Sequence, residues 1–307
     1  MLLPVDLDAR ALDTLHDDPV AWRPAVVALA QSLGADANAV QQEAEGTVLV
    51  ARLGRERVLK LYPPFLRDHF EFERAMLERL HGRLSVPTPQ LIASGEYAGW
   101  PYLLMTQLAG DPLTATWPAM SERERCRLLA ALGALTAEVH ALPVGDMATL
   151  APPWPHFVAQ QRERCTARQQ RNGLPPHLLA ALRGFIAGPV PEGPAVLLTG
   201  EYTPMNLFTS GTRGASLAAM FDFGDGLIGP REYDWLGPLC FLAAGQAPRV
   251  AAFMAGVGVR LDEALRTTLL RLLLLHRYSN LPAQLACEGW QQAAGFEALA
   301  AHVWPLA

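Results

Sequence analysis

The sequence predicts an α+β protein in which a small antiparallel sheet precedes a larger, mostly helical region. Between residues 45 and 108, two pairs of β-rich runs flank one amphipathic stretch, whereas most of the later sequence is rich in Ala and Leu at helical spacing. The composition shifts near Gly110, and 307 residues are enough for about two domains. We therefore expect an N-terminal lobe at residues 1–109 and a helical C-terminal lobe at residues 110–307.

The first forty residues are expected to form a short helical lead-in. Apolar runs at residues 48–50 and 58–62 follow, and a polar connection that contains Gly54 lies between them. Two β-rich runs around a glycine-containing turn predict a β-hairpin. Two consecutive prolines after the second run end this hairpin.

A helix and a second pair of strands complete the expected N-terminal lobe. Apolar residues recur at helical spacing from Asp68 to Leu84, with charges between them. Apolar runs at residues 91–97 and 102–108 then predict two more strands, and a Gly-Asp-Pro sequence ends the second. The order strand, strand, helix, strand, strand suits an antiparallel sheet with one packed helix.

The second region is expected to be mainly helical. Residues 122–142 predict a long helix, and residues 157–187 predict two more after a proline-rich break. Residues 195–198 form an apolar strand, and the runs at 206–208 and 218–223 predict a pair of strands. Helices rich in Leu and Ala fill the C-terminal part.

Composition narrows the class of protein. The net charge is -5 and the pI is near 5.9, which does not favour nucleic-acid binding because that usually needs a basic face. The four cysteines are far apart and form no Cys-x-x-Cys pair, so we expect free thiols rather than disulfides or structural zinc. No signal peptide and no membrane-spanning run is apparent. We expect a soluble cytoplasmic protein, monomeric or homodimeric, without a membrane partner.

Three residues have the spacing of a phosphoryl-transfer site. Kinases place a catalytic acid five residues before a metal-binding Asn, with a second Asp in a later Asp-Phe-Gly segment. Glu201 and Asn206 have this separation, and Asp222 stands in a Phe-Asp-Phe-Gly sequence. Amide and carboxylate oxygens are the ligands that magnesium prefers. A carboxylate between two phenylalanines is also costly unless it is paired or metal-bound.

The chain resembles the aminoglycoside phosphotransferase and choline-kinase-like superfamily, which has a two-lobed protein-kinase-like fold. The resemblance extends from about Glu45 to Pro238. Residues 102–113 resemble the family's strand, hinge and Gly-x-x-Leu linker, and residues 128–142 resemble its helix ending in Leu-His. Residues 220–235 resemble its metal-binding Asp segment, followed by a Gly-Pro turn and a second Asp.

The resemblance implies a nucleotide-binding role for residues of the N-terminal lobe. Lys60 would contact the nucleotide's phosphates, with Glu73 as its helix partner and Glu71 as the competitor. Gln107 to Ala109 would form the hinge strand that meets adenine through backbone groups. The implied cofactors are ATP and Mg²⁺.

The resemblance assigns the chemistry to the C-terminal lobe. Asn206 and Asp222 would hold magnesium, and Asp234 would brace the catalytic loop through its backbone. Glu201 stands where the family has its catalytic Asp, because the chain reads Thr-Gly-Glu in place of the usual His-Gly-Asp. The additional methylene moves the carboxylate by about 1 Å, which can cost on the order of 10²-fold in rate.

Taken singly, these residues also have simpler interpretations. Lys60 could be a solvated side chain on a strand, and Asn206 could end a turn. Asp234 could be a helix N-cap, and His140 is expected to be a structural histidine at a helix end. The order of the whole set along the chain favours the kinase interpretation.

The function implied is an ATP-dependent kinase that phosphorylates a hydroxyl of a small molecule, such as an aminoglycoside-like antibiotic, an amino alcohol or a related metabolite. The alternative is a catalytically silent nucleotide-binding protein on the same fold, which the Thr-Gly-Glu replacement would explain. The acceptor pocket would be built from the C-terminal helices, where five residues are available: Asp262, Glu263, His276, Glu288 and Trp290. Acids there could suit a cationic acceptor or form a solvated face.

Overall fold

The computed structural model describes residues 3–36, 40–42, 47–200, 202–211 and 216–306. It confirms the α+β architecture, and the chain divides into two compact units. Unit 1 consists of residues 1–83, 87–109 and 223–225. Unit 2 consists of residues 84–86, 110–222 and 226–307. The main polypeptide crossing from unit 1 to unit 2 is therefore at Ala109–Gly110.

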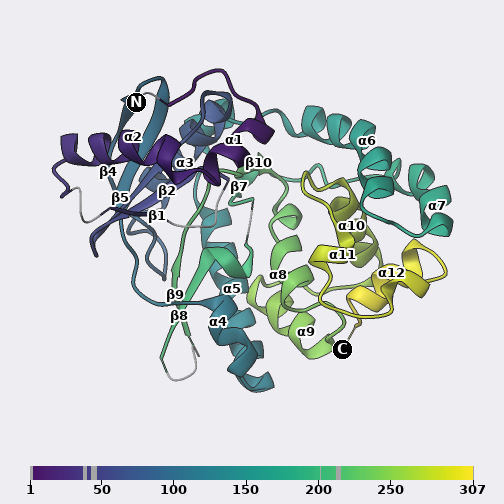
Figure 1. Ribbon diagram of the computed structural model, residues 1–307. Coiled ribbons are helices and arrows are strands. Elements are labelled where there is room, and N and C mark those ends of the chain that lie inside the picture. Colours follow the sequence, from purple (N-terminus) through teal and green to yellow (C-terminus); the bar gives the residue numbers. More distant parts are fainter. Residues whose placement is uncertain (1–2, 37–39, 43–46, 201, 212–215, 307) are drawn as a thin grey trace. The chain divides into compact units, whose positions relative to one another are not determined.

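Unit 1 contains a five-stranded antiparallel sheet in the order β1-β2-β3-β5-β4 (Figure 1). Its strands are β1 Val40–Gln42, β2 Leu49–Leu53, β3 Arg57–Leu61, β4 Leu91–Tyr97 and β5 Trp100–Thr106. The predicted hairpin is confirmed, because β2 pairs with β3 and Leu53 lies opposite Arg57. Gly54 has φ +70° in the turn, a conformation that favours glycine. The short strand β1 was not predicted.

Helices pack on both faces of this sheet. The lead-in forms α1 (Ala9–His16) and α2 (Pro19–Ser32), whose buried side chains share one apolar cluster with Leu59 and Leu61 of β3. Side chains alternate between the faces of a strand, so Lys60 points to the opposite face. It meets α3 (Arg67–Leu80) there, which is the predicted helix.

Helix α3 ends four residues earlier than the sequence pattern predicts. His81 has an extended ψ of 123°, and Gly82 follows with φ +71°. A glycine in the left-handed region is a common end of a helix, because it costs no side-chain strain there. The apolar periodicity up to Leu84 therefore extends beyond the helix itself.

Unit 2 contains two small sheets. One has the order β6-β8-β9, with β6 Asp111–Pro112, β8 Leu207–Ser210 and β9 Ser216–Met220. The other pairs β7 (Val196–Leu198) with β10 (Leu227–Gly229). The predicted pairing of the two runs near residues 207 and 219 is confirmed, because Leu207 lies opposite Met220. The second run was expected to continue as a strand to residue 223, which is wrong.

The described part of unit 2 contains nine helices and several short 3₁₀ turns (Figure 1). The helices are α4 Leu113–Thr116, α5 Glu122–Ala141, α6 Trp154–Arg171, α7 Pro176–Ile186, α8 Leu236–Phe241, α9 Ala247–Gly256, α10 Glu263–Leu275, α11 Leu281–Gln284 and α12 Phe296–Val303. Helix α5 starts with a capping box, in which Ser121 and Glu124 satisfy each other's backbone amides.

Helices α5 and α9 approach each other closely through glycines. A Cβ added to Gly133 would lie 2.4 Å from the carbonyl oxygen of Phe253, and one added to Gly256 would lie 2.2 Å from that of Ala130. Neither distance is compatible with a side chain unless the helices separate. The absence of a side chain at both positions therefore sets the distance between these helices.

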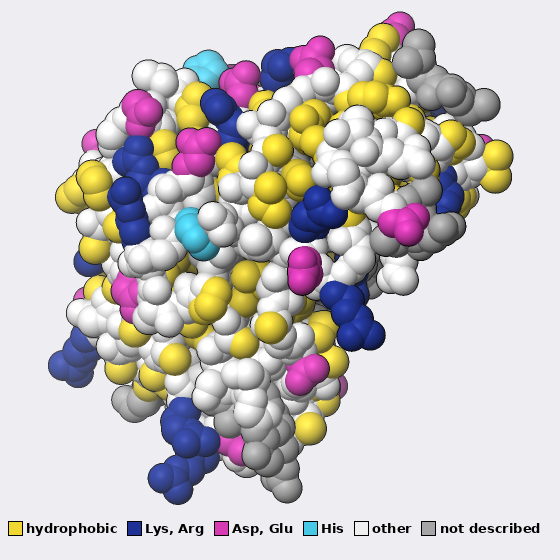
Figure 2. All heavy atoms as spheres, turned by 90° about the vertical axis from the view of Figure 1, so that its left-hand side faces the viewer, with side chains coloured by type: hydrophobic (Ala, Val, Ile, Leu, Met, Phe, Trp, Pro, Cys, Tyr) yellow, Lys and Arg dark blue, Asp and Glu magenta, His cyan; other side chains and the backbone are white. Residues whose placement is uncertain are grey.

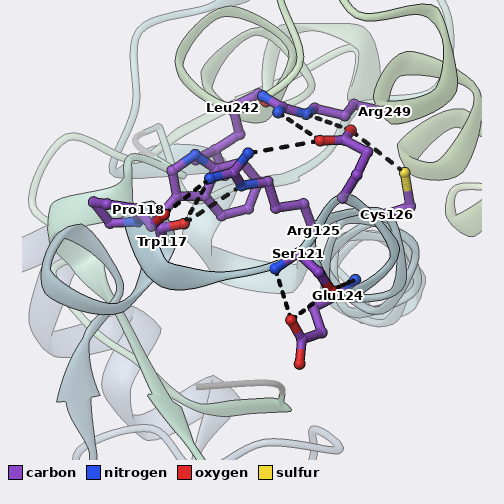
Figure 3. Close-up of polar contacts among 9 residues, drawn as sticks. Trp117, Pro118, Ser121, Glu124, Arg125, Cys126, Leu242 and Arg249 are labelled. Atoms are coloured by element: carbon purple, nitrogen blue, oxygen red, sulfur yellow. Dashed lines mark hydrogen bonds and ion pairs between the residues drawn. The ribbon is translucent and has the colours of Figure 1, made fainter. Parts of the chain in front are cut away.

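A polar cluster joins the first turn of α5 to α9 (Figure 3). Both side-chain oxygens of Glu122 accept hydrogen bonds from Arg249, from Nε and Nη2, at 2.7 Å each. The guanidinium carbons of Arg125 and Arg249 lie 5.4 and 5.5 Å from the ring centroid of Trp117. With a rise of 1.5 Å per residue, this cluster is about 27 Å along the helix from His140.

The structure bears on two of the composition-based expectations. The four cysteines are free thiols. None of the helices in the described ranges is long and apolar enough to cross a bilayer. On the face seen in Figure 2, acidic and basic side chains are interspersed with apolar ones, in keeping with the small net charge.

Candidate active site

Asn206 and Asp222 lie at neighbouring ends of two paired strands. Asn206 closes a 3₁₀ turn directly before β8, and Phe221 directly follows β9. The Phe221 amide donates a hydrogen bond to the Asn206 carbonyl oxygen at 3.1 Å. Asn206 is 8% exposed and Asp222 is half-buried. The β8–β9 pairing thus brings two residues with hard oxygen donors to one end of a β-ribbon.

Asp222 has a backbone conformation that few residues with a side chain adopt. Its φ is +69°, and among the described residues other than glycine only Ala98 also has a positive φ. This conformation costs about 1 kcal/mol or more, although Asp tolerates it better than most residues. It ends the extended strand at Met220 and explains why the predicted strand stops before the carboxylate.

Asp234 holds the loop that follows β7. Its Oδ2 accepts a hydrogen bond from the Thr199 amide at 2.9 Å, and its Oδ1 accepts one from the Gly200 amide at 3.0 Å. The Asp234 side chain has no exposed surface. The predicted contact with the loop backbone is therefore present. Asp234 does not cap α8, because that helix starts after Trp235 without a side-chain cap.

The Asp234 carboxylate has two further donors. The Thr199 hydroxyl lies 3.3 Å from Oδ1, and His140 Nε2 lies 3.1 Å from Oδ2. Because a carboxylate only accepts hydrogen bonds, His140 donates this bond through Nε2–H. His140 in the last turn of α5 thus has the structural role predicted for it. With four donors on its two oxygens, Asp234 is a positioning residue for the loop.

Glu201, the predicted catalytic acid, lies outside the described residues. The residues on either side of it are well fixed. Thr199 and Gly200 are bound to Asp234, and a Cβ added to Gly237 would lie 2.7 Å from the Tyr202 carbonyl oxygen. The backbone that enters and leaves position 201 is therefore anchored by neighbouring segments of unit 2.

Lys60 and Glu73 form a buried ion pair in unit 1. Lys60 Nζ lies 2.8 Å from Oε1 and 3.0 Å from Oε2 of Glu73. The Tyr62 hydroxyl donates a further hydrogen bond to Oε2. Lys60 is 8% exposed and Glu73 is 1% exposed. Of the two candidate partners, Glu73 is the one that Lys60 contacts, whereas Glu71 is not part of this pair.

The segment after Asp222 belongs to unit 1 and lies against the same helix. A Cβ added to Gly224 would lie 3.2 Å from Oε2 of Glu73, closer than side chains normally approach. His69 Nδ1 on α3 lies 3.5 Å from Oδ1 of Asp225. A glycine at position 224 therefore lets this segment pack next to the ion pair.

The predicted hinge residues leave the sheet at the end of β5. The strand ends at Thr106. Gln107 to Ala109, which were predicted to form the hinge strand, therefore lie outside it. The Gln107 amide donates to the Glu56 carbonyl oxygen at 2.7 Å. A contact of Gln107 with adenine through its backbone would therefore use its carbonyl oxygen.

A cavity of about 260 Å³ opens in unit 2 beside the loop that Asp234 holds. Its lining includes Gly200, Tyr233, Leu273, His276 and Tyr278. Of the five residues predicted for an acceptor pocket, only His276 lines this cavity. The four predicted residues that do not line it are Asp262, Glu263, Glu288 and Trp290. No local pattern in the sequence points to the two tyrosines, because their positions follow from tertiary packing.

His276 is a neutral, fixed ring in the cavity wall. It stacks on Tyr233 with ring centroids 4.7 Å apart, and its Nδ1 accepts a hydrogen bond from the Tyr278 amide at 3.2 Å. Burial, together with the charges of Arg277 and Arg168, lowers the pKa of His276 to about 3. The ring is thus uncharged at neutral pH, and its proton is on Nε2.

The phosphotransferase enzyme family has a model that matches residues 36–279, which is well over half of the chain. No curated protein matches the sequence. The solved structures that it resembles include the GDP complex of aminoglycoside 2'-phosphotransferase-IIIa, with a TM-score of 0.66 and 18% identity. That match covers 84% of this chain and 88% of the other.

Two further solved structures resemble the chain. The macrolide 2'-phosphotransferase MphH from Brachybacterium faecium has a TM-score of 0.59 and 21% identity, over 92% of this chain and 99% of its own. The ternary complex of APH(2")-IIa with streptomycin and ATP has a TM-score of 0.59 and 13% identity, over 90% and 93%. At these identities the likeness shows the shared protein-kinase-like fold. The match over residues 36–279 shows that the chain belongs to the phosphotransferase enzyme family.

Proposed function

We propose that this protein is an ATP-dependent kinase that transfers the γ-phosphoryl group to a hydroxyl of a small molecule. The observation that carries the proposal is the meeting of Asn206 and Asp222 at the end of the β8–β9 ribbon. Phosphoryl transfer depends on positioning and charge stabilisation, so it needs fixed metal ligands, a fixed cation and an acid near the acceptor. The chain has a candidate for each.

The residues at the ribbon end fit magnesium. Mg²⁺ usually binds through one or two protein oxygen ligands, with phosphates and water completing its octahedron. Asn206 and Asp222 would supply these two ligands, and no cluster of three His, Cys, Asp or Glu suited to a metal occurs among the described residues. When bound, magnesium would neutralise charge on the phosphates of the nucleotide.

Lys60 would supply the fixed cation. The ion pair with Glu73 holds the ammonium group in one position although it is nearly buried. Such a group can bind phosphate oxygens without reorganising during the reaction. Solved structures of the same fold contain GDP, ATP or ADP, which supports a purine nucleotide as the phosphoryl donor here.

The loop held by Asp234 would present the base. Glu201 would accept or orient the proton of the acceptor hydroxyl, and the cavity beside Gly200 would hold the acceptor. Asp234 contributes by fixing the Thr199 and Gly200 amides and takes no part in proton transfer, because its oxygens already accept four hydrogen bonds.

Incubation with ATP, Mg²⁺ and a panel of hydroxyl compounds tests the proposal. A phosphorylated acceptor is heavier by about 80 mass units. Asp222→Asn should weaken Mg-ATP binding about tenfold or more, and Asn tolerates the positive φ of this position, so the variant should fold. Glu122→Gln, in the first turn of α5 and about 27 Å along that helix from His140, is the matched control and should behave like the wild type. Absence of product across a broad panel would refute the kinase assignment.

A catalytically silent nucleotide-binding protein is the second candidate. The observation that favours it is the glutamate at position 201, where the resembling family has aspartate. In that case Mg-ATP binds, Asp222→Asn weakens the binding, and no acceptor is phosphorylated. Glu201→Gln separates the two functions, because it should lower the rate of a kinase by about 10²-fold or more while nucleotide binding stays unchanged.

A further inference from the structure

One wall of the cavity is a turn at the end of α10, and we call its residues 274–279 the wall turn. His276 and Tyr278 line the cavity from this turn. The Ser279 amide donates to the His276 carbonyl oxygen at 3.0 Å, and the Tyr278 amide donates to Nδ1 of His276 at 3.2 Å. The places of the two rings in the cavity therefore depend on what holds the ends of the wall turn.

Gln169 of α6 contacts both ends of the wall turn. Its Nε2 donates to the Leu274 carbonyl oxygen at 3.3 Å and to the Ser279 hydroxyl oxygen at 2.7 Å. An amide NH₂ group has two protons, so this bridge uses both of them. Gln169 is 1% exposed and Ser279 is fully buried, so water has little access to compete for these bonds. The bridge ties the two ends of the turn to each other and to α6.

Each end of the wall turn also has a separate contact with the α6 region. Nη2 of Arg168 donates to the Leu274 carbonyl oxygen at 3.2 Å. Nδ2 of Asn172, the residue that follows α6, donates to the Ser279 carbonyl oxygen at 2.9 Å. Of these three side chains, Gln169 is the one that bonds to both ends. Its loss would therefore leave each end attached but no longer joined to the other.

The bridge is not required to pair buried polar groups. Without Gln169, the Leu274 carbonyl oxygen keeps its bond from Arg168, and removal of the Ser279 hydroxyl removes the other acceptor of the bridge. Replacing both partners of a buried hydrogen bond by apolar groups of the same shape is nearly neutral for stability. A buried polar network that stability does not require specifies one arrangement of the parts that it joins.

We infer that Gln169 is a positioning residue for the acceptor, because its bridge holds the wall turn, with His276 and Tyr278, in one place. Gln169 is not among the described residues that line the cavity, so it acts through these two rings. The inference rests on the proposed function, because it takes this cavity as the acceptor site. A wall that is in its binding position only part of the time lowers the apparent affinity by that fraction.

A double variant removes the bridge while its remaining acceptor stays paired. Gln169→Met with Ser279→Ala replaces both partners by apolar groups, so the denaturant midpoint should stay close to that of the wild type. Exchange of the Tyr278 amide proton in the full-length protein, measured by NMR, should become about tenfold faster. Gln170→Met makes the same change at the exposed neighbouring glutamine and is the matched control, which should not alter either measurement.

Binding of 4-fluorobenzyl alcohol, followed by fluorine NMR without nucleotide, reports the state of the cavity. This probe has one ring and one hydroxyl, which suits a cavity of about 260 Å³. Its affinity should fall about fivefold in the double variant and less in Ser279→Ala alone, the milder change. Ala283→Trp, which adds a large side chain to the lining, should abolish binding and so locate the probe in the cavity.

Three results would overturn the inference. The first is equal affinity of the double variant and the wild type for the probe, and the second is no binding to the wild type. The third is a loss of affinity that occurs only together with a lower denaturant midpoint, because Gln169 would then act through stability.

The kinase assignment is tested separately by adding Mg-ATP and the panel of hydroxyl compounds. No phosphorylated product, with weakened probe binding in the double variant, would refute the kinase and leave the role of Gln169 in the cavity standing. For an acceptor that is phosphorylated, a KM about fivefold higher with unchanged kcat in the double variant would support both. Unchanged KM and kcat would support the kinase and refute the positioning role.

Discussion

Replacing Asp234 with Asn changes one atom of the group that holds the loop before position 201. Each carboxylate oxygen accepts one backbone amide and one side-chain donor. Whichever way the Asn side chain turns, its NH₂ group faces two donors, so one loop amide always loses its acceptor. A buried donor left without a partner costs about 1–3 kcal/mol. Because the Thr199 hydroxyl can turn to accept from the NH₂ group, one or two bonds are lost, and the free energy of unfolding should fall by about 2–4 kcal/mol.

The same substitution should impair turnover more than folding. A loss of about 2–4 kcal/mol leaves a protein of ordinary stability folded at 25 °C. The Thr199 or Gly200 amide would move off its acceptor, and a displacement of about 1 Å near a catalytic group costs on the order of 10²-fold in kcat. Denaturant unfolding measures the first effect, and the rate of acceptor phosphorylation measures the second.

Two comparisons sharpen this experiment. Glu122→Gln changes a half-exposed carboxylate at the other end of α5 and should cost less than about 1 kcal/mol without changing kcat. A nucleotide-binding measurement on Asp234→Asn separates a local loop effect from general unfolding. If this variant unfolds within about 1 kcal/mol of the wild type and turns over normally, the four hydrogen bonds do not hold the loop and the reasoning is wrong.

Three further substitutions probe other parts of the fold. Glu73→Gln replaces the buried carboxylate that pairs with Lys60 by an uncharged amide and should lower the free energy of unfolding by about 3–5 kcal/mol. A change below about 1 kcal/mol in a denaturant titration would contradict this. Gly133→Ala places a Cβ 2.4 Å from the backbone of α9 and should lower the free energy of unfolding by about 3 kcal/mol. Gly184→Ala, whose Cβ would have nothing within 4 Å, should raise the melting temperature slightly. The hydrogen bond from Arg249 is the main cause that lowers the pKa of Glu122. This contact therefore stabilises the fold at pH values above the unfolded-chain pKa of about 4.3. That contribution is lost as the pH falls through the lower folded-state pKa, so the melting temperatures of wild type and Glu122→Gln should converge in acid. If the two melting temperatures stay equally far apart at every pH, this prediction is wrong.

Local patterns in the sequence were sufficient to predict most elements of unit 1. The hairpin around Gly54 and the amphipathic helix with Glu73 follow from alternation and helical periodicity, which short segments encode by themselves. Strand β1 was missed because it has three residues and is held by backbone pairing to β2. Its sequence carries no alternation that would distinguish it from a loop.

The end of β9 could not be predicted because apolar residues continue past it for separate reasons. Phe221 packs against Phe208 with ring centroids 4.8 Å apart, whereas Phe223 is fully buried and belongs to unit 1. A run of alternating apolar residues looks the same whether its members share one sheet face or belong to two different cores. The left-handed backbone at Asp222 between them has no signature in the residue type alone.

The candidate site was predictable where motifs carry it and not where packing does. The predicted pairing of the two strands brings Asn206 and Asp222 to one end of a ribbon, and their role as metal ligands stays a prediction. The cavity lining draws on segments from residue 200 to residue 284, and no local pattern links these segments. The acidic residues expected there lie elsewhere: Asp262 caps α10 by accepting the Leu265 amide at 2.8 Å.

The glutamate at position 201 gives a last test, because the backbone on both sides of it is anchored. Thr199 and Gly200 are bound to Asp234, and Tyr202 packs against Gly237. Each of these flanking residues would have to leave its contacts for the loop to compensate for a shorter side chain. If the site is active with glutamate, Glu201→Asp should lower kcat by about 10²-fold with little change in nucleotide affinity. This loss is expected even though the family that the chain resembles has aspartate at this position. A higher kcat in the aspartate variant would instead mean that the anchored loop is built for the shorter acid and that Glu201 is a poor base in it.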